Sequence, residues 1–275
     1  MTTVRTLEDF APAPLDQTLE RESRPRAVAD ALTIAWRNLL NLRRNPQLAV
    51  FATIQPVIFV LMFRYVFGGA IKVTGESYVN FLMPGIFVQT VVFGSLTTGV
   101  GLAEDLQKGL VERFRSLPMA RSAVLVGRTL ADLVRNAFVV VLMCVVGLLV
   151  GWRPSGSIPA IVLGVLLVLA FAYSLSWVFA IVGLSARDSE TAQAASFPIL
   201  APLVFASSAF VPVSSMPGWL QAFAKHQPVS VVVDAVRALT LGLPAGSHVW
   251  AALAWIVGII ALCAPLAVRR YRQVT

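Results

Sequence analysis

Six stretches of this chain contain no charged residue, and their length and apolar character set the expected architecture. They cover residues 45–63, 77–103, 136–152, 154–186, 191–224 and 238–268. A membrane-spanning helix needs about 20 apolar residues, a length that the third stretch reaches when residues 131–135 are added. The pattern therefore predicts an all-α membrane protein with six transmembrane helices, near 47–67, 79–102, 130–150, 158–184, 194–211 and 248–268.

The segment before the first predicted span is amphipathic. Within 27–45 the apolar positions recur at helical spacing and share one face, namely Val28, Leu32, Ala35, Trp36, Leu39 and Leu42. A plain extension of the first span is the alternative, but Arg43, Arg44 and Pro46 lie between the two segments. We therefore expect an N-terminal interfacial helix over 27–45 that lies along the membrane surface.

A second amphipathic segment, 103–118, follows the second predicted span. One apolar stripe on it consists of Leu106, Leu110, Phe114 and Leu117. Pro118 ends the predicted helix, because the residue before a proline is disfavoured in the helical region. A short amphipathic helix that projects from a membrane bundle is typical of a docking element. A solvated connector that merely continues the span has the same pattern, and spacing alone does not separate these interpretations.

The connection between spans five and six is long and unusual. It begins with "VPVSSMPGWLQAFAKHQP" (211–228), which is broken by prolines yet rich in Trp and Phe. Pro212 and Pro217 bracket its start, and Pro228 breaks it before a second short helical pattern. Irregular backbone at membrane depth is tolerated only where protein buries it or water lines it. We therefore expect 212–246 to form re-entrant helices that cover the outer end of the bundle.

Composition and charge predict that lipid surrounds the chain and predict how the chain is oriented in the membrane. Only 13% of the residues are charged, against about 25% in soluble domains. Sixteen Lys and Arg residues fall on the side of the termini, five fall on the other side, and Arg135 lies within a span. This asymmetry predicts a multi-pass protein with both termini in the cytoplasm. It also accounts for most of the net charge of +8, so no nucleic-acid partner is indicated.

Two further biases refine this picture. Residues 1–26 contain five acidic residues and three prolines, a composition that predicts a disordered cytoplasmic tail. The remainder, 27–272, reads as a single transmembrane domain. Arg outnumbers Lys 19 to 3, as expected for a protein from a GC-rich bacterium, so we expect a bacterial plasma membrane.

The sequence lacks the usual signatures of an enzyme. It contains no phosphate-binding loop of the Walker type, no HExxH motif and no nucleophile elbow. The two histidines are 22 residues apart, and both cysteines fall within predicted spans. We therefore expect no catalytic residue, no metal and no cofactor bound by this chain. Asp132 can pair with Arg128 or Arg135 on one helix face, and we interpret this cluster as a structural anchor rather than a proton relay.

Uncharged polar and aromatic residues within the spans are the candidates for a substrate path. The set comprises Gln55, Phe59, Gln89, Phe93, Phe205 and Ser207. Such a path suits a hydrophobic or amphipathic molecule, although packing and helix–helix hydrogen bonds explain any single member equally well. No carboxylate lies at the predicted mid-depth of a span, so ion coupling is disfavoured as the energy source.

Four segments together resemble the ABC type-2 exporter permeases of the daunorubicin-resistance kind. They are "AWRNLLNLRRNP", "YVNFLMPGIFVQT", "GLVERFRSLPMARSAVLVGRTLADL" and "FVPVSSMPGWLQAFAKHQPVSVVVDAVRAL". The resemblance covers nearly the whole chain, from about residue 27 to residue 272. It implies the membrane subunit of an exporter of drug-like or lipid-like molecules, with ATP and Mg²⁺ bound by a separate nucleotide-binding ATPase. It also implies pairing with a second permease, here expected to be an identical copy, in contact with membrane lipid.

The resemblance assigns roles to two segments. It identifies 103–118 as a coupling helix on the ATPase, with docking residues Leu106, Lys108, Leu110, Glu112, Arg113, Phe114 and Arg115. It identifies 212–246 as an extracellular gate, with Pro212, Met216, Pro217, Trp219, Leu220, Phe223 and Arg237. Export of a lipid-linked glycan, a non-transporting membrane scaffold and a secondary transporter are the alternatives. The outer-loop pattern and the lack of mid-membrane carboxylates weigh against the last two.

Overall fold

A computed structural model describes residues 27–44, 46–69, 77–109 and 121–274 of the chain. The predicted tail 1–26 lies outside the described residues. The helices are α2 (Ala27–Arg44), α3 (Pro46–Leu61), η2 (Met62–Phe67), α4 (Tyr78–Gln107), α6 (Arg121–Val150), α7 (Ile158–Ser185), α8 (Ser189–Phe205), η3 (Val213–Ser215), α9 (Gly218–His226), α10 (Pro228–Leu241) and α11 (Gly246–Val274). Of these, η2 is a π-helical turn and η3 a 3-10 turn. The described chain is thus all-α, as the sequence predicts.

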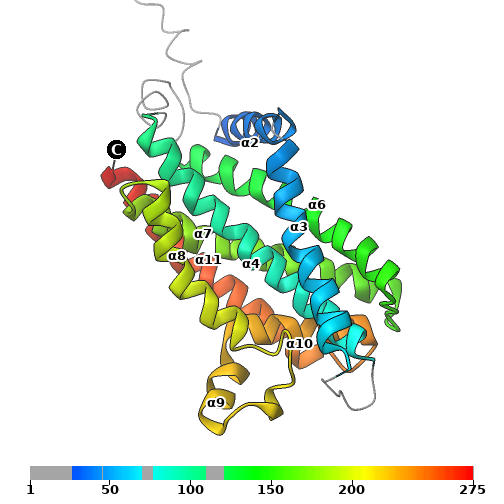
Figure 1. Cartoon of the computed structure of the whole chain (residues 1–275). Coiled ribbons are helices and arrows are strands. Elements are labelled where there is room, and N and C mark those ends of the chain that lie inside the picture. The colour runs from blue at the N-terminus through cyan, green and yellow to red at the C-terminus, as the bar shows by residue number, and fades with distance from the viewer. Residues whose placement is uncertain (1–26, 45, 70–76, 110–120, 275) are drawn as a thin grey trace, which may run out of the picture.

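The long helices form one bundle in which α3, α4, α6, α7, α8 and α11 share a general direction (Figure 1). Helix α2 lies across one end of this bundle, which we call the α2 end. The C-terminal end of α11 lies at the same end (Figure 1). Helix α9 and the loop before it project from the opposite end, the α9 end (Figure 1).

Four helices are long and apolar enough to cross a membrane: Tyr78–Gln107, Val124–Val150, Ile158–Ser185 and Gly246–Gln273. The other two predicted spans coincide with shorter helical segments. The first is α3 together with η2, of which Thr53–Phe67 is an apolar stretch. The second is α8, which has 17 residues and carries Pro198 and Pro202 within it. A count of six spans therefore remains a prediction for these two segments.

Helices α4 and α7 form the centre of the bundle. They cross where Gly99 of α4 faces Gly183 of α7, and a Cβ atom on either glycine would collide with the backbone of the other helix. Near the crossing, the Ser95 hydroxyl donates to the Ala172 carbonyl at 3.0 Å. Small residues at helix crossings let backbones approach closely in membrane proteins. The crossing therefore holds α4 in the middle of the bundle, where its first half is largely buried.

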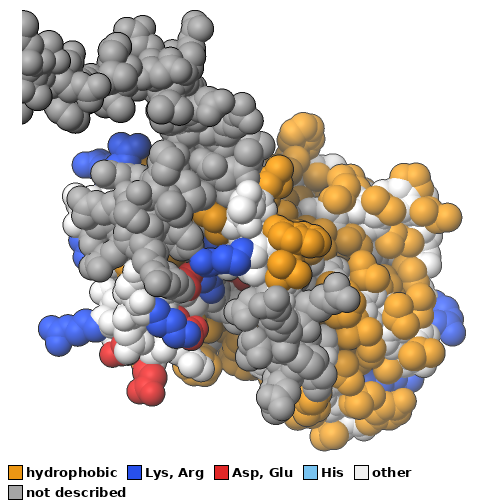
Figure 2. All heavy atoms as spheres, turned by 90° about the horizontal axis from the view of Figure 1, so that it is seen from above, with side chains coloured by type: hydrophobic (Ala, Val, Ile, Leu, Met, Phe, Trp, Pro, Cys, Tyr) orange, Lys and Arg blue, Asp and Glu red, His pale blue; other side chains and the backbone are white. Residues whose placement is uncertain are grey.

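The outer surface of the bundle is apolar. Large hydrophobic side chains are exposed along α6, α7 and α11, among them Phe138, Leu149, Ile158, Trp250 and Leu262. Figure 2, seen from the α2 end, shows a continuous hydrophobic flank on one side and charged side chains gathered on the other. An exposed apolar area of this extent is typical of a surface that faces lipid or protein.

Helix α2 packs its small residues against α6. Ala31, Ile34 and Ala35 are buried, and Gly127 of α6 lies so close that a Cβ there would collide with the Ala31 carbonyl and the Ile34 side chain. Leu32 and Trp36 are 58% and 64% exposed. The apolar face expected from the sequence is therefore divided between a protein contact at Ala35 and an open side at Leu32 and Trp36. This open side is free to contact a membrane surface.

Candidate functional site

The predicted docking residues lie at the α2 end or outside the described residues. Leu106 is half-buried and packs against the hydrophobic cluster beneath α2. Lys108 is exposed and donates to Glu104 at 2.5 Å, an interaction that raises the pKa of the lysine. The remaining five, Leu110, Glu112, Arg113, Phe114 and Arg115, lie outside the described residues.

The structure differs from the sequence expectation at the start of 103–118. Residues 103–107 continue α4 and do not begin a separate helix. The helix ends at Lys108, whose backbone N–H still bonds to the Glu104 carbonyl, and Gly109 follows with a φ of 66°. Glycine adopts this left-handed conformation without steric cost, which is why it commonly terminates helices.

The predicted gate residues occupy two different environments. Pro212, Met216 and Pro217 lie in the loop around η3, and α9 carries Trp219, Leu220 and Phe223. Trp219 is 76% exposed and Phe223 is 44% exposed, so α9 presents an aromatic face away from the bundle. Arg237 is separate from this group, because α10 is buried and places the arginine within the bundle.

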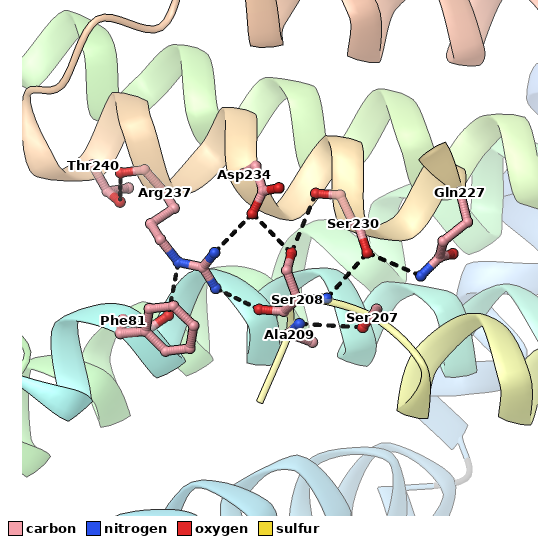
Figure 3. A network of polar contacts seen from close by, with 9 residues as sticks. All are labelled: Phe81, Ser207, Ser208, Ala209, Gln227, Ser230, Asp234, Arg237 and Thr240. Atoms are coloured by element: carbon pink, nitrogen blue, oxygen red, sulfur yellow. Dashed lines mark hydrogen bonds and ion pairs between the residues drawn. The ribbon is translucent and has the colours of Figure 1, made fainter. Parts of the chain in front are cut away.

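Arg237 holds three segments together (Figure 3). Its guanidinium pairs with Asp234 at 2.8 Å, donates to the Ser208 carbonyl at 2.7 Å and donates to the Phe81 carbonyl at 3.2 Å. It also lies over the Phe81 ring, 3.8 Å from the centroid. These contacts join α10 to the N-terminal part of α4 and to the turn after α8. Arg237 therefore fixes the consecutive helices α9 and α10, which we call the α9–α10 hairpin, to the bundle.

The turn after α8 is anchored by a second group of hydrogen bonds (Figure 3). The Ser208 hydroxyl donates to Asp234 at 2.8 Å, and the Ser208 N–H donates to the Ser230 hydroxyl at 3.0 Å. The Gln227 amide donates to Ser230 at 3.1 Å and to the Leu203 carbonyl at 2.9 Å. A buried backbone turn needs such partners.

The six predicted path residues divide into two groups. Phe59, Phe205 and Ser207 lie towards the α9 end, where Phe59 and Phe205 have ring centroids 6.3 and 6.0 Å from that of Phe210. Ser207 is buried and its hydroxyl donates to the Val204 carbonyl. Gln55, Gln89 and Phe93 instead line a cavity. The six predicted residues are therefore not together: three lie towards the α9 end and three line the cavity.

The cavity has a volume of about 730 Å³ and lies between α2, α3, α4 and α6. Its lining extends along α4 from Gln89 to Lys108, a length of roughly 28 Å at about 1.5 Å per residue. Gln89 lies in the middle of α4, and Lys108 lies at the α2 end. The cavity therefore reaches from the α2 end to the interior of the bundle.

Ion pairs line much of the cavity. Arg128 of α6 pairs with Asp105 of α4, and Asp132 pairs with Arg135 at 3.0 Å. Asp132 also accepts a hydrogen bond of 2.6 Å from Thr98, and Arg135 donates to the Gly94 carbonyl at 2.7 Å. These contacts fit the predicted structural anchor and join α6 to α4. Among the described residues, no group of three or more His, Cys, Asp or Glu side chains is placed to hold a metal ion.

Two amides in the cavity wall have atoms without partners. The Gln89 side-chain oxygen and the Asn136 side-chain nitrogen are buried and make no hydrogen bond. Gln89 is 3% exposed and Asn136 is 2% exposed. Buried polar side chains in native proteins are generally satisfied. The Arg128 Nε atom, in the same cavity wall, also lacks a partner, but it lies nearer the α2 end, so the two amides mark the deep part of the cavity.

Sequence reasoning missed Asn136 and the Asp105–Arg128 pair. Asp105 precedes Arg128 by 23 residues and lies on another helix, so no intrahelical spacing indicates the contact. Asn136 follows Arg135 at a position that reads as ordinary span interior. The spacings of three residues between Asp234 and Arg237 and between Gln227 and Ser230 were the local signals for the network around Arg237, because residues i and i+3 are neighbours on a helix.

Comparisons with known proteins agree with this architecture. The family model described as ABC-2 type transporter matches residues 30–241. A daunorubicin resistance ABC transporter permease protein of Streptomyces coeruleorubidus is 37% identical over 92% of this chain and 90% of its own. A probable doxorubicin resistance ABC transporter permease protein of Mycobacterium tuberculosis is 30% identical over 90% of both chains. The all-helical, multi-span chain described above therefore belongs to the ABC-2 type transporter family of membrane permeases.

Proposed function

We propose that this chain is the membrane subunit of an ATP-driven exporter that moves a hydrophobic or amphipathic molecule out of the cytoplasm or the inner leaflet. The observation that carries the proposal is the similarity to two permeases named for resistance to daunorubicin or doxorubicin, which extends over about nine-tenths of the chain. Similarity of this length includes both the bundle and the α9–α10 hairpin. It favours drug-like molecules as substrates, and the proposal also includes lipid-like ones.

ATP and Mg²⁺ bind to a separate ATPase subunit in this proposal. The sequence has no phosphate-binding loop, whereas its connection after α4 carries the predicted coupling segment. The Asp105–Arg128 pair fastens the end of α4 to α6, so a displacement of the coupling segment moves both helices together. Coupling between sites requires that the ATPase contact the two states of the permease differently.

The transport path lies between two copies of this chain in the plasma membrane, with both termini in the cytoplasm. The α2 end then faces the cytoplasm, in agreement with the Lys and Arg asymmetry. The α9 end faces outward, and the hairpin held by Arg237 closes the outer end of the path. Because Arg237 bonds both to α4 and to the turn after α8, this gate follows the motion of the bundle.

Co-purification with the ATPase encoded beside this chain tests the proposal. Glu112→Arg and Phe114→Asp are expected to insert normally but to lose the ATPase, because both change the predicted docking face. Lys225→Glu is the control, since Lys225 is exposed on α9 at the opposite end. Recovery of the ATPase at the wild-type yield with both docking variants would contradict the assignment.

A further inference from the structure

We propose that the cavity between α2, α3, α4 and α6 binds an amphipathic molecule through an uncharged hydroxyl or carbonyl group, held by Gln89 and Asn136. This inference rests on the proposed function, because it assigns a substrate site within the exporter. It places that site inside one protomer, on the side of the bundle that opens at the α2 end.

The partnerless amides are the first observation that points to a ligand. Gln89 and Asn136 are 97% or more buried, yet one polar atom of each has no hydrogen bond. An unsatisfied buried amide destabilises a fold, whereas an apolar residue of similar size does not. A ligand hydroxyl both donates and accepts, so it suits either the acceptor on Gln89 or the donor on Asn136.

Two glycines of α4 supply the second observation. A Cβ at Gly94 would collide with the Asn136 amide, and a Cβ at Gly101 would collide with the Arg128 guanidinium. Both glycines line the cavity and lie seven residues apart, about two helical turns, so they share one face of α4. The absence of side chains there makes room for polar groups of α6 beside the cavity.

The dimensions and walls suit an amphipathic molecule. A volume of about 730 Å³ falls within the range of about 300–1,000 Å³ that is usual for small-molecule sites. Phe93, Val100 and Val139 provide apolar walls, and the two amides lie among them. The extent along α4 fits a molecule with an apolar body and a polar end.

Charge compensation determines which polar group enters the deep part. Asp132, next to the amides, is paired with Arg135, and Asp105, nearer the mouth, is paired with Arg128. A charged ligand group beside these pairs would lack a counter-ion and would lose its hydration. An uncharged hydrogen-bonding group meets neither penalty. At the mouth, Lys108 is paired with Glu104.

Photolabelling of the intact permease–ATPase complex in nanodiscs tests the proposal. One probe is a diazirine-bearing monoacylglycerol, which represents a membrane lipid, and the other is a diazirine-bearing aryl ketone of drug size. Each is compared with an analogue that carries a trimethylammonium head. Labelling of cavity residues Phe93 and Val139 is divided by labelling of Val141, which is exposed on the outer face of α6.

The expected result is strong cavity labelling by at least one neutral probe and at least fivefold less by its charged analogue. Labelling by the lipid probe alone would indicate a membrane lipid as the ligand, and labelling by the ketone alone would indicate a drug-like molecule. Gln89→Leu with Asn136→Leu should lower cavity labelling about tenfold, because hydrogen bonding to the amides is lost. Gln193→Leu, on the exposed side of α8, is the matched control and should change nothing.

Thermal unfolding separates binding from folding. Because neither orphaned atom has a partner in the protein, the double variant should melt at or above the wild-type temperature. If it fails to fold, Phe93→Trp, which narrows the cavity and keeps both amides, should lower labelling instead. The proposal is overturned if neither neutral probe labels the cavity, if the charged analogues label it equally, or if the folded variants label like the wild type.

The same samples keep this inference distinct from the proposed function. If the permease co-purifies no ATPase, labelling of the permease alone that depends on Gln89 and Asn136 would support the site and contradict the exporter assignment. ATP-driven transport that persists in the double variant at the wild-type rate would support the exporter and overturn the site.

Discussion

Asp105, near the end of α4, forms an ion pair with Arg128 of α6, and the two side chains are only 18% and 19% exposed. The pair lies at the mouth of the cavity and close to the predicted coupling segment. It therefore connects the part of the chain expected to contact an ATPase with the helix that carries Asp132, Arg135 and Asn136.

Breaking this pair is expected to destabilise the bundle. Asp105→Asn leaves the Arg128 guanidinium without a carboxylate, at a cost of about 1–3 kcal/mol. The exchange of the charges, Asp105→Arg with Arg128→Asp, should recover more than half of that loss. Unfolding of the purified variants in nanodiscs, analysed as a double-mutant cycle, measures the coupling. Single-variant effects that add within about 0.5 kcal/mol would show that the residues act independently.

Alanine substitutions at two glycines, one at the α4–α7 crossing and one away from it, are expected to change stability differently. Gly183→Ala places a methyl group against the Gly99 carbonyl, and we expect a loss of about 1–3 kcal/mol from overpacking. Gly258→Ala on α11 meets no atom within 4 Å, so the higher helix propensity of alanine should leave stability unchanged or raise it by up to about 1 kcal/mol. Thermal unfolding measures the change in stability of each variant. Equal changes for the two variants would contradict close packing of α4 against α7 at Gly183.

Loss of Arg237 is expected to loosen the α9–α10 hairpin. Arg237→Gln leaves Asp234 without its cation and removes the donors to Ser208 and Phe81. Because the Asp234 side chain is 36% exposed and keeps its bond from Ser208, we expect a cost of about 1–3 kcal/mol. Hydrogen–deuterium exchange should then accelerate in α10 and in residues 206–212. Lys225→Gln, an exposed change on α9, is the control. Unaltered exchange in the Arg237 variant would contradict the bracing role.

The start of α8 gives a prediction about pH. The Asp188 carboxylate accepts a hydrogen bond of 2.7 Å from the Thr191 N–H, which holds its pKa below the ordinary value of 3.8. Its contribution to stability is therefore complete above the ordinary pKa and is lost as the pH falls through the lowered one. NMR of the Thr191 amide should show a titration midpoint below 3.8. Asp188→Asn should keep the cap and abolish that titration, and a midpoint above 3.8 would contradict this cap.

Sequence patterns indicated where the helices lie but not which side chains meet. The charge-free run predicted a helix near 158–184, and α7 covers Ile158–Ser185. The expected break at Pro228 is where α10 begins. In both cases the signal is local, because apolar length and proline act within one segment.

Contacts between helices depend on the rotation of each helix about its own axis, which no single segment encodes. Arg128 and Arg135 were equivalent partners for Asp132 by spacing, and the structure assigns Arg128 to Asp105 of α4 instead. Phe93 and Phe205 were grouped as one path because both are aromatic, yet they lie in different parts of the bundle. The same limit hid Asn136, whose role follows only from its position opposite Gly94.

ATP-dependent transport tests the central claim most directly. Inverted membrane vesicles that contain this chain and its neighbouring ATPase would be supplied with doxorubicin or a fluorescent phospholipid, and accumulation would be followed with and without ATP. The account predicts ATP-dependent accumulation of at least one of them, and its loss in Phe114→Asp. The absence of ATP-dependent accumulation of both, with the ATPase present and active, would contradict the assignment of this chain as an exporter subunit.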